Sequence, residues 1–354
     1  MTQVSPLHQM HLNAGALLTE NYGWLLPASF GNVAGEYATL RTAAGLIDLS
    51  HRSKVVLRGK DRASFLHNFC TNDILKTPSG SGCEAFLTNH QAKILAWLQI
   101  NVAAEEISLH AEPNLASKLI AYLGRYLITE EVEFSDRTTH EALLLVTGPA
   151  VTARLPMLAG WQPRQHQRLT IENLAVQAAC TAIYGQPSYF LSVGSEDAAK
   201  LWEYLRTQEF QPVGLEAYEI LRLEAGVPAY GQDIDETNLP QEMDRTEQAI
   251  SFTKGCYVGQ ETVARIRAFG HVNRLFRKLV LGVKVAESLV GAKLHRQGQE
   301  VGQVTSASFS PHRGTTLALG YLRRGHQEPG IEVEVVTANG TWAARVEAAS
   351  PLPA

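Results

Sequence analysis

The C-terminal part of the chain places the strictest limit on its fold. After Arg274, short runs with the composition of β-strands alternate with glycine-rich turns. Short strands joined by such turns are typical of small barrels and sandwiches. The pattern therefore predicts an all-β domain over residues 274–354. The runs span residues 278–283, 300–308, 317–321, 331–336 and 342–346.

The preceding residues alternate between helical and strand patterns. Residues 215–225 have helical periodicity and stop before Gly226 and Pro228, which commonly end a helix. Two β-like runs, 83–88 and 94–102, are separated by a short connection and predict a hairpin. A chain of 354 residues is expected to form two or three domains, here of mixed α and β structure. Further helices are expected over 35–49, 113–123 and 197–207, and further strands over 53–58 and 141–147.

The composition is that of an ordinary globular protein. Hydrophobic residues make up 45% of the chain and charged residues 19%, with a formal net charge of −4. This charge gives no general attraction to nucleic acid or an anionic membrane, and no apolar run is long enough to predict a membrane span. The N-terminus has neither a basic region nor a continuous apolar segment, so we expect no secretory signal and a cytoplasmic location.

The cysteines are spread along the chain. Cys70, Cys83, Cys180 and Cys256 form no C-x-x-C pair, and no clustered histidine spacing completes a zinc site. We therefore expect free thiols and no metal site. A stable iron–sulfur cluster on these cysteines is not expected either, because such clusters usually need about four thiolates gathered together.

One of these thiols has a distinctive setting. The octapeptide Lys254-Gly-Cys-Tyr-Val-Gly-Gln-Glu261 places Cys256 between two glycines and two residues after a lysine. A nearby ammonium favours the thiolate, which is the form of cysteine that attacks electrophiles. Free cysteines are also commonly small buried hydrophobes, so the residues alone leave both interpretations open.

The octapeptide resembles the K-x-C-Y-x-G-Q-E signature of the YgfZ family, the folate-binding paralogues of the glycine-cleavage T protein. The resemblance implies an α+β fold: a three-domain ring of the aminomethyltransferase (T-protein) type around a folate channel, with a small C-terminal β-barrel. It covers nearly the whole chain. The matching stretches are residues 44–50, 65–73, 221–233, 302–311 and 318–321.

The resemblance also implies a domain division. Residues 1–273 would form the folate-binding region, with two α/β subdomains around 35–140 and 141–225. The motif segment 226–273 would close this region, and residues 274–354 would form the barrel.

Roles for individual residues follow from the same resemblance. It makes Cys256 the functional thiol, with Lys254 as its activator or anion contact. Gln260 and Glu261 would be local hydrogen-bonding partners. The bound cofactor would be tetrahydrofolate or a derivative. The folate contacts would be Arg222, Tyr189, Asn89 and Tyr230.

Two positions depart from the aminomethyltransferase pattern. Those enzymes have the segment N-x-x-G-G-x-x-D-D-L, in which an aspartate works beside the folate. The corresponding residues here are Ala96 and Trp97, and neither can accept a proton. His90, in the preceding hairpin, would substitute only by entering the site from elsewhere. The chain is therefore expected not to be an aminomethyltransferase.

A second departure concerns the folate itself. The transferases hold the pterin with carboxylates, and the matching positions here are Gln186 and Phe190. A phenylalanine cannot satisfy the paired donors of a pterin ring as a glutamate does. Folate binding would then be weakened or would use stacking on Tyr189 or Phe190, unless these aromatics only pack a strand.

Residues 250–278 carry a positive bias that the whole chain lacks. Such a local field would attract the glutamate tail of folate, an acidic partner or tRNA phosphates. A solvated basic face is an equal alternative. The basic residues are Lys254, Arg265, Arg267, Arg274, Arg277 and Lys278, against one acid, Glu261.

Together these features predict a folate-binding accessory protein that supports iron–sulfur cluster assembly or repair through Cys256, with indirect effects on tRNA modification. Its expected partners are folate and iron–sulfur client or assembly proteins, with direct tRNA binding ranked lower and no membrane. The alternative is a folate-dependent aminomethyltransferase or another one-carbon-transfer enzyme of the T-protein type.

Overall fold

The computed structural model describes residues 2–349 and groups them into two compact units. Unit 1 contains the described residues up to Ala85 together with Ala96–Tyr218. Unit 2 contains Phe86–Leu95 and the described residues from Glu219 onward. The tip of the predicted hairpin is thus grouped with the C-terminal half of the chain.

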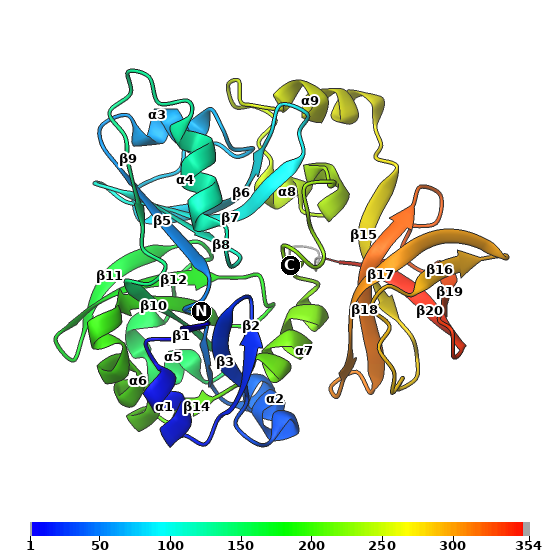
Figure 1. Cartoon of the computed structure of the whole chain (residues 1–354), viewed down its shortest axis with the longest axis horizontal. Coiled ribbons are helices and arrows are strands. Elements are labelled where there is room, and N and C mark those ends of the chain that lie inside the picture. The colour runs from blue at the N-terminus through cyan, green and yellow to red at the C-terminus, as the bar shows by residue number, and fades with distance from the viewer. Residues whose placement is uncertain (1, 350–354) are drawn as a thin grey trace. The chain divides into compact units, whose positions relative to one another are not determined.

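Three sheets use residues of unit 1 (Figure 1). The first, in the order β1-β3-β2, contains β1 Gln3–Val4, β2 Leu17–Asn21 and β3 Trp24–Ser29. The second, in the order β11-β12-β13-β10-β4-β14, contains β4 Gly45–Asp48, β10 Glu141–Thr147, β11 His166–Ile171, β12 Leu174–Thr181, β13 Ser188–Gly194 and β14 Gln211–Pro212. The third, in the order β6-β7-β8-β5-β9, contains β5 Ser53–Arg58, β6 Ser81–Thr88, β7 Ile94–Val102, β8 Ile107–Ala111 and β9 Glu133–Asp136.

The helices of unit 1 are short, and α6 is clearly amphipathic. In α6, Ala198–Thr207, the buried residues are spaced by three and four positions, which places them on one face of the helix. That face joins the core of the six-stranded sheet through Leu201, Trp202 and Leu205. The other α-helices are α1 His8–Asn13, α2 Val33–Thr42, α3 Arg62–His67, α4 Ala116–Gly124 and α5 Val151–Arg154, and α7 Leu215–Ala225 runs on into unit 2.

Unit 2 contains a closed barrel in the order β15-β18-β17-β16-β19-β20. Inward-facing Leu, Val and Ala side chains fill its core, including Leu279, Leu294 and Val335. Closure pairs every strand with two neighbours, so the barrel has no open edge. Its strands are β15 Arg274–Val280, β16 Lys293–Arg296, β17 Gln299–Ser310, β18 Thr315–Arg323, β19 Glu332–Val336 and β20 Thr341–Ala348, and the helices before them are α8 Thr246–Ala249 and α9 Gln260–Phe269.

Most of the expected elements are present. Strands 53–58 and 141–147 and helix 215–225 have the predicted bounds, and the hairpin and C-terminal β domain also form. The predicted helix over 35–49 is wrong in its second half, because α2 ends at Thr42 and Gly45–Asp48 form β4. All four β4 residues are buried between β10 and β14, so this strand lacks the polar alternation that would identify it.

A buried carboxylate organises the polar interior of unit 1. Asp48 is 3% exposed, and its Oδ1 accepts hydrogen bonds from the Ser50 backbone N–H at 2.9 Å and the Ser50 hydroxyl at 2.5 Å. Its Oδ2 accepts from the Ser5 hydroxyl and lies 3.3 Å from His11 Nε2. A buried charge is tolerated when donors surround it in this way.

Burial lowers the pKa of several histidines in this unit, because it removes the water that stabilises an imidazolium. For His51 the pKa falls to about 3; Asp48 opposes this shift, whereas Arg52 and Lys54 add to it. Burial is also the largest cause of the lowered pKa of His11, His110 and His166. These histidines are therefore neutral in the folded protein at neutral pH.

We predict that the free energy of unfolding is greatest above about pH 6.5 and falls below it. The pKa of His51 is lower in the folded protein than in the unfolded chain, so the unfolded chain binds the proton first. At pH 5.5 such a histidine lowers the free energy of unfolding by about 1.4 kcal/mol relative to pH 7.5. Urea unfolding of His51→Gln at the two pH values should show a smaller pH difference than the unaltered protein. The exposed control His312→Gln should keep the full difference, and an equal difference in all three proteins would contradict the prediction.

Candidate functional site

The octapeptide forms an irregular segment that leads into α9 (Figure 1). Cys256 is exposed, and its thiol has no hydrogen-bond or ionic partner among residues 2–349. The interpretation of this cysteine as a buried hydrophobe is therefore wrong. Its thiol is open to small molecules in solution.

Gly259 fixes the position of the segment on the hairpin. It has a φ of +86°, and a Cβ at this position would lie 2.6 Å from the Asn89 carbonyl oxygen and 3.0 Å from Ala92 Cα. Only glycine allows both this backbone conformation and this close approach. Beside it, the Thr88 hydroxyl donates to the Val258 carbonyl at 2.7 Å. The second glycine of the motif thus serves packing against the hairpin.

Asn89 shapes the tip of that hairpin. Its side-chain Oδ1 accepts hydrogen bonds from the backbone N–H groups of Gln91 and Lys93, both at 2.9 Å. Lys93 Nζ in turn donates to the Thr237 carbonyl at 2.5 Å. The oxygen of Asn89 is therefore committed to the turn, and its Nδ2 has no hydrogen-bond partner within residues 2–349.

Lys254 is buried, with 6% of its surface exposed. Its Nζ lies 4.8 Å from the ring centroid of Tyr257, a cation–π contact that partly offsets the lost hydration of the ammonium. The predicted role of Lys254 as an activator of Cys256 stays a prediction. The contact to Tyr257 shows that the lysine holds the segment together from inside.

Gln260 and Glu261 form the first turn of α9. Glu261 is exposed, and a carboxylate at this end of a helix is favoured by the helix dipole. The Gln260 side chain lines a pocket together with Ser251 and Phe252. Sequence reasoning missed these last two residues, because no spacing or motif distinguishes them from ordinary loop residues.

Ala96 and Trp97 lie in the core. They occupy β7 with exposed fractions of 0% and 3%. The structure therefore offers no acid or base at the positions where the aminomethyltransferase segment carries aspartates. His90, on the hairpin tip, is exposed.

The guanidinium of Arg222 connects several segments of unit 2 through hydrogen bonds. Its Nε and Nη2 donate to Glu219, its Nη1 donates to Val227 O at 2.6 Å and to Asp233 Oδ2 at 2.7 Å, and its Nη2 also donates to Ser306 Oγ at 3.0 Å. These bonds use all five N–H donors of a guanidinium. A folate contact for Arg222 stays a prediction, but it would require one of these bonds to be given up.

The remaining predicted folate contacts differ in their surroundings. Tyr189 belongs to the core of unit 1, where it is 4% exposed and its hydroxyl donates to Leu158 O at 3.0 Å. Gln186 donates to the Thr147 hydroxyl at 2.8 Å. Tyr230, in unit 2, is partly exposed, with its hydroxyl 3.4 Å from Ile94 O. Tyr230 is thus better placed than Tyr189 to meet a ligand.

Most of the basic side chains of residues 250–278 contact other groups of the protein. Arg265 and Arg267 are exposed on α9, whereas the other cations are buried or paired. No continuous basic face that would favour tRNA therefore forms on this segment. The internal partners are Tyr257 for Lys254, Glu242 and Tyr321 for Arg274, Asp244 for Arg277, and the Glu224 carbonyl for Lys278.

Residues 2–349 contain neither a cluster of metal-ligating side chains nor a helix that could cross a membrane. The described side chains include no group of three His, Cys, Asp or Glu residues arranged to hold a metal ion. No helix within the same residues is both long and apolar enough to cross a membrane.

We predict that Gly259→Ala destabilises the protein more than Gly270→Ala. Both glycines have a positive φ, +86° and +82°, so both variants bear a backbone penalty of about 1–2 kcal/mol. Only at Gly259 does the new methyl group also meet backbone atoms, whereas Gly270 has open space. The clash should add about 1–3 kcal/mol in urea unfolding. Equal losses for the two variants would show that the close approach to the hairpin does not constrain the segment.

We also predict that Asp233→Asn lowers the free energy of unfolding by about 1.5–3 kcal/mol, because it removes the buried one of the two carboxylates that pair with Arg222 and leaves only the partly exposed Glu219. The control is Glu347→Gln, which breaks the half-exposed pair with Arg313 and should cost about 1 kcal/mol or less. Chemical unfolding followed by tryptophan fluorescence measures both. Comparable small losses would refute the structural role of the Arg222–Asp233 pair.

Comparison with known proteins gives matches over nearly the whole chain. The family described as GCVT N-terminal domain matches residues 7–254, and the glycine-cleavage T-protein C-terminal barrel domain matches residues 277–352. An aminomethyltransferase from Nostoc sp. is 29% identical, with 94% of this chain and 90% of the relative covered. One from Symbiobacterium thermophilum is 28% identical, with 97% and 95% covered.

These comparisons contradict two predictions from the sequence. The relatives that match along the chain are named aminomethyltransferases, so the predicted accessory role in iron–sulfur cluster assembly or repair is wrong. The expectation that the chain is not an aminomethyltransferase is wrong on the same grounds. Both predictions rested on the resemblance of the octapeptide and of five further stretches, together with Ala96 and Trp97, whereas the relatives named aminomethyltransferase match along nearly the whole length of both parts of the chain.

A solved structure has the same fold. The glycine cleavage system aminomethyltransferase T from Bartonella henselae superimposes with a TM-score of 0.88 at 24% identity, over 98% of this chain and 97% of that one. The predicted α+β fold of the T-protein type with a C-terminal barrel is confirmed. With the two domains matched in order along residues 7–352, the chain belongs to the glycine-cleavage T-protein family.

Proposed function

We propose that this protein transfers a one-carbon unit between an aminomethyl donor and tetrahydrofolate, as an aminomethyltransferase of the T-protein type. The observation that carries the proposal is the similarity to relatives of that name over 94% or more of the chain. Tetrahydrofolate is a substrate of this family, and in this proposal it accepts the carbon.

Such a transfer has a defined proton balance. The aminomethyl carbon becomes the methylene carbon of methylenetetrahydrofolate, while its bonds to the amine and to the donor break. The two folate nitrogens that bind the carbon lose their protons. One proton reaches the departing amine, which leaves as ammonia, and one reaches the leaving atom of the donor. Groups that donate and accept protons would therefore speed the reaction.

The proton-transfer groups of this protein must differ from the aspartate of the T-protein segment, since Ala96 and Trp97 are buried and have no acidic group. We assign this part to Cys256 and Glu261, which are both exposed and close in sequence on the segment held against the hairpin. Lys254 and Gln260 support them in this proposal by fixing the segment and the first turn of α9.

The proposed folate contacts are Asn89 and Tyr230. The Nδ2 of Asn89 is a donor without a protein acceptor in the described part of the chain. Tyr230 is partly exposed, and its hydroxyl donates to Ile94 O over 3.4 Å. Arg222 and Tyr189 are less suited, because their donors already have close acceptors inside the protein.

Within the family, we propose that the chain belongs to the YgfZ subgroup. The octapeptide with Cys256, and Ala96 and Trp97 at the aspartate positions, support this placement. Cytoplasmic location is part of the same proposal.

The decisive measurement is formation of methylenetetrahydrofolate from tetrahydrofolate and an aminomethyl donor, with release of ammonia in equal amount. We predict that Cys256→Ser and Glu261→Gln each lower kcat by about 10²-fold or more, the range expected when an acid or base is lost. KM should change little, because neither substitution removes a proposed folate contact.

The matched control is Glu332→Gln, which removes an exposed carboxylate from barrel strand β19 and should leave kcat unchanged. Failure of the unaltered protein to form methylenetetrahydrofolate would overturn the proposed reaction. Turnover that is equally high in Cys256→Ser and Glu261→Gln would keep the reaction but reject the roles given to these two residues.

A further inference from the structure

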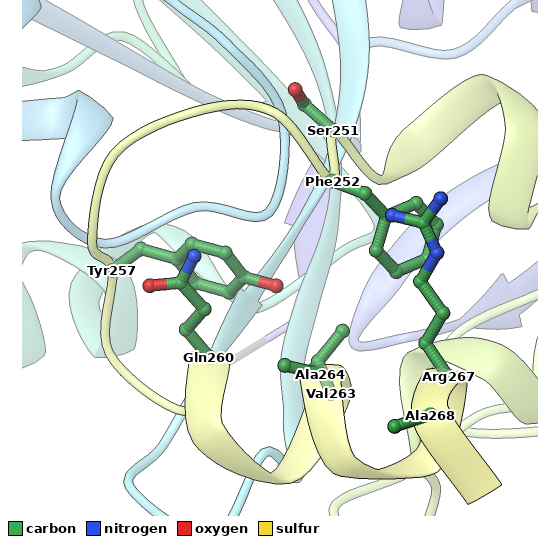
Figure 2. Close-up of a pocket in the computed structure, with 8 residues that line it drawn as sticks. All are labelled: Ser251, Phe252, Tyr257, Gln260, Val263, Ala264, Arg267 and Ala268. Carbon is green, nitrogen blue, oxygen red and sulfur yellow. The ribbon is translucent and has the colours of Figure 1, made fainter.

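A pocket of about 300 Å³ lies between α9 and the segment that carries the cysteine motif (Figure 2). Figure 2 shows Arg267 lying over Phe252 and Gln260 rising from α9 beside Tyr257. The Arg267 guanidinium carbon is 4.0 Å from the Phe252 ring centroid. Small side chains leave the space open above the helix. The lining residues are Ser251, Phe252, Tyr257, Gln260, Val263, Ala264, Arg267 and Ala268.

Several polar side chains of this pocket have no partner in the part of the chain that the structure describes. Within residues 2–349, no hydrogen bond or ion pair joins the Ser251 hydroxyl, the Gln260 amide or the Arg267 guanidinium to another residue. Polar side chains on a surface normally bond to water, but here three kinds of donor belong to the lining of one hollow. A few polar groups among aromatic and apolar walls are the usual composition of a ligand site.

The positive charge of the pocket lining favours a negatively charged ligand. Arg267 is the single charged side chain among the lining residues, and none of them is acidic. A guanidinium presents paired N–H donors that match the two oxygens of a carboxylate. Ser251 and Gln260 can each donate one further hydrogen bond to such an anion.

The aromatic walls and the volume of the pocket favour a flat ligand with a single ring. Phe252 and Tyr257 provide aromatic faces, which favour a flat ring through stacked or edge-to-face contacts. A volume of about 300 Å³ is at the lower end of small-molecule pockets, so it suits one ring with a short substituent. It is too small to hold a pteridine, a benzoyl group and a glutamate together.

We propose that this pocket is a binding site for a single-ring aromatic or heteroaromatic carboxylate. Arg267 holds the carboxylate, Ser251 and Gln260 complete its hydrogen bonds, and Phe252 and Tyr257 contact the ring. The assignment does not rest on the proposed reaction, because the lining and its partners are the same whatever the protein catalyses.

A neighbouring pocket of about 530 Å³ is a competing location. It shares Phe252 and Arg267 with the first, and adds Thr246, Glu247 and His271. The acidic Glu247 makes it less suited to an anion. Two hydroxyl side chains separate the pockets experimentally, since Ser251 lines the smaller one and Thr246 the larger one.

The test is calorimetric titration of the full chain with benzoate and nicotinate, beside two matched ligands: neutral benzamide and non-aromatic cyclohexanecarboxylate. We expect one aromatic carboxylate per chain, bound about tenfold more tightly than either matched ligand. Arg267→Gln should weaken binding about tenfold. Arg265→Gln, on the same helix but outside the pocket, should leave it unchanged within about twofold. Ser251→Ala should weaken binding and Thr246→Val should not.

Any of three results would overturn the proposal. The first is absence of binding by both aromatic carboxylates at about 10 mM. The second is equal binding by Arg267→Gln and Arg265→Gln, which would mean a diffuse charge effect. The third is loss of binding in Thr246→Val but not in Ser251→Ala, which would place the ligand in the larger pocket. Thermal unfolding of each variant shows whether it remains folded, and the change at exposed Arg267 is expected to be tolerated.

Discussion

The buried pair of Arg222 and Asp233 is the constraint on which unit 2 depends. Arg222 lies in the last turn of helix α7, Asp233 lies in the following segment, and both bond to the barrel strand β17 through Ser306. Asp233 Oδ1 also accepts from the Thr305 hydroxyl, and its backbone carbonyl accepts from Tyr321. A buried charge pair needs every donor and acceptor to be matched, so it fixes one arrangement of helix, segment and barrel. The hairpin tip and the cysteine segment are positioned by further contacts within this same unit.

The sequence predicts correctly those helices and strands whose apolar residues form a regular local pattern. Strands β5 and β10 and helix α7 have the predicted bounds because apolar runs and helix-stopping residues mark them locally. Strand β4 was mistaken for the end of a helix, since its neighbours bury both of its faces. The short strand β16, Lys293–Arg296, was missed because its polar residues give no apolar run. Both segments become strands because of their pairing with distant strands, and no local sequence pattern marks them.

In the candidate site, too, the sequence predicts features that neighbouring residues determine but not contacts between distant residues. The sequence shows that glycines flank Cys256, but it does not show that Gly259 approaches the hairpin so closely that a Cβ would lie 2.6 Å from the Asn89 carbonyl oxygen. The bond between Arg222 and Ser306 could not be predicted, because the two residues are 84 positions apart in the chain. The function inferred from the octapeptide was wrong for a related reason. A short motif reports the chemistry of one segment, whereas the family is determined by the similarity of the whole chain.

The pocket beside α9 is built entirely from residues 251–268, a single continuous stretch. Its lining can therefore change without any change in the strands that form the cores of the six-stranded sheet and the barrel. A few substitutions in this stretch would be enough to exchange one ligand for another. Homologous proteins could thus differ in what they bind here while keeping the same fold, and this stretch is where an engineer would alter ligand preference.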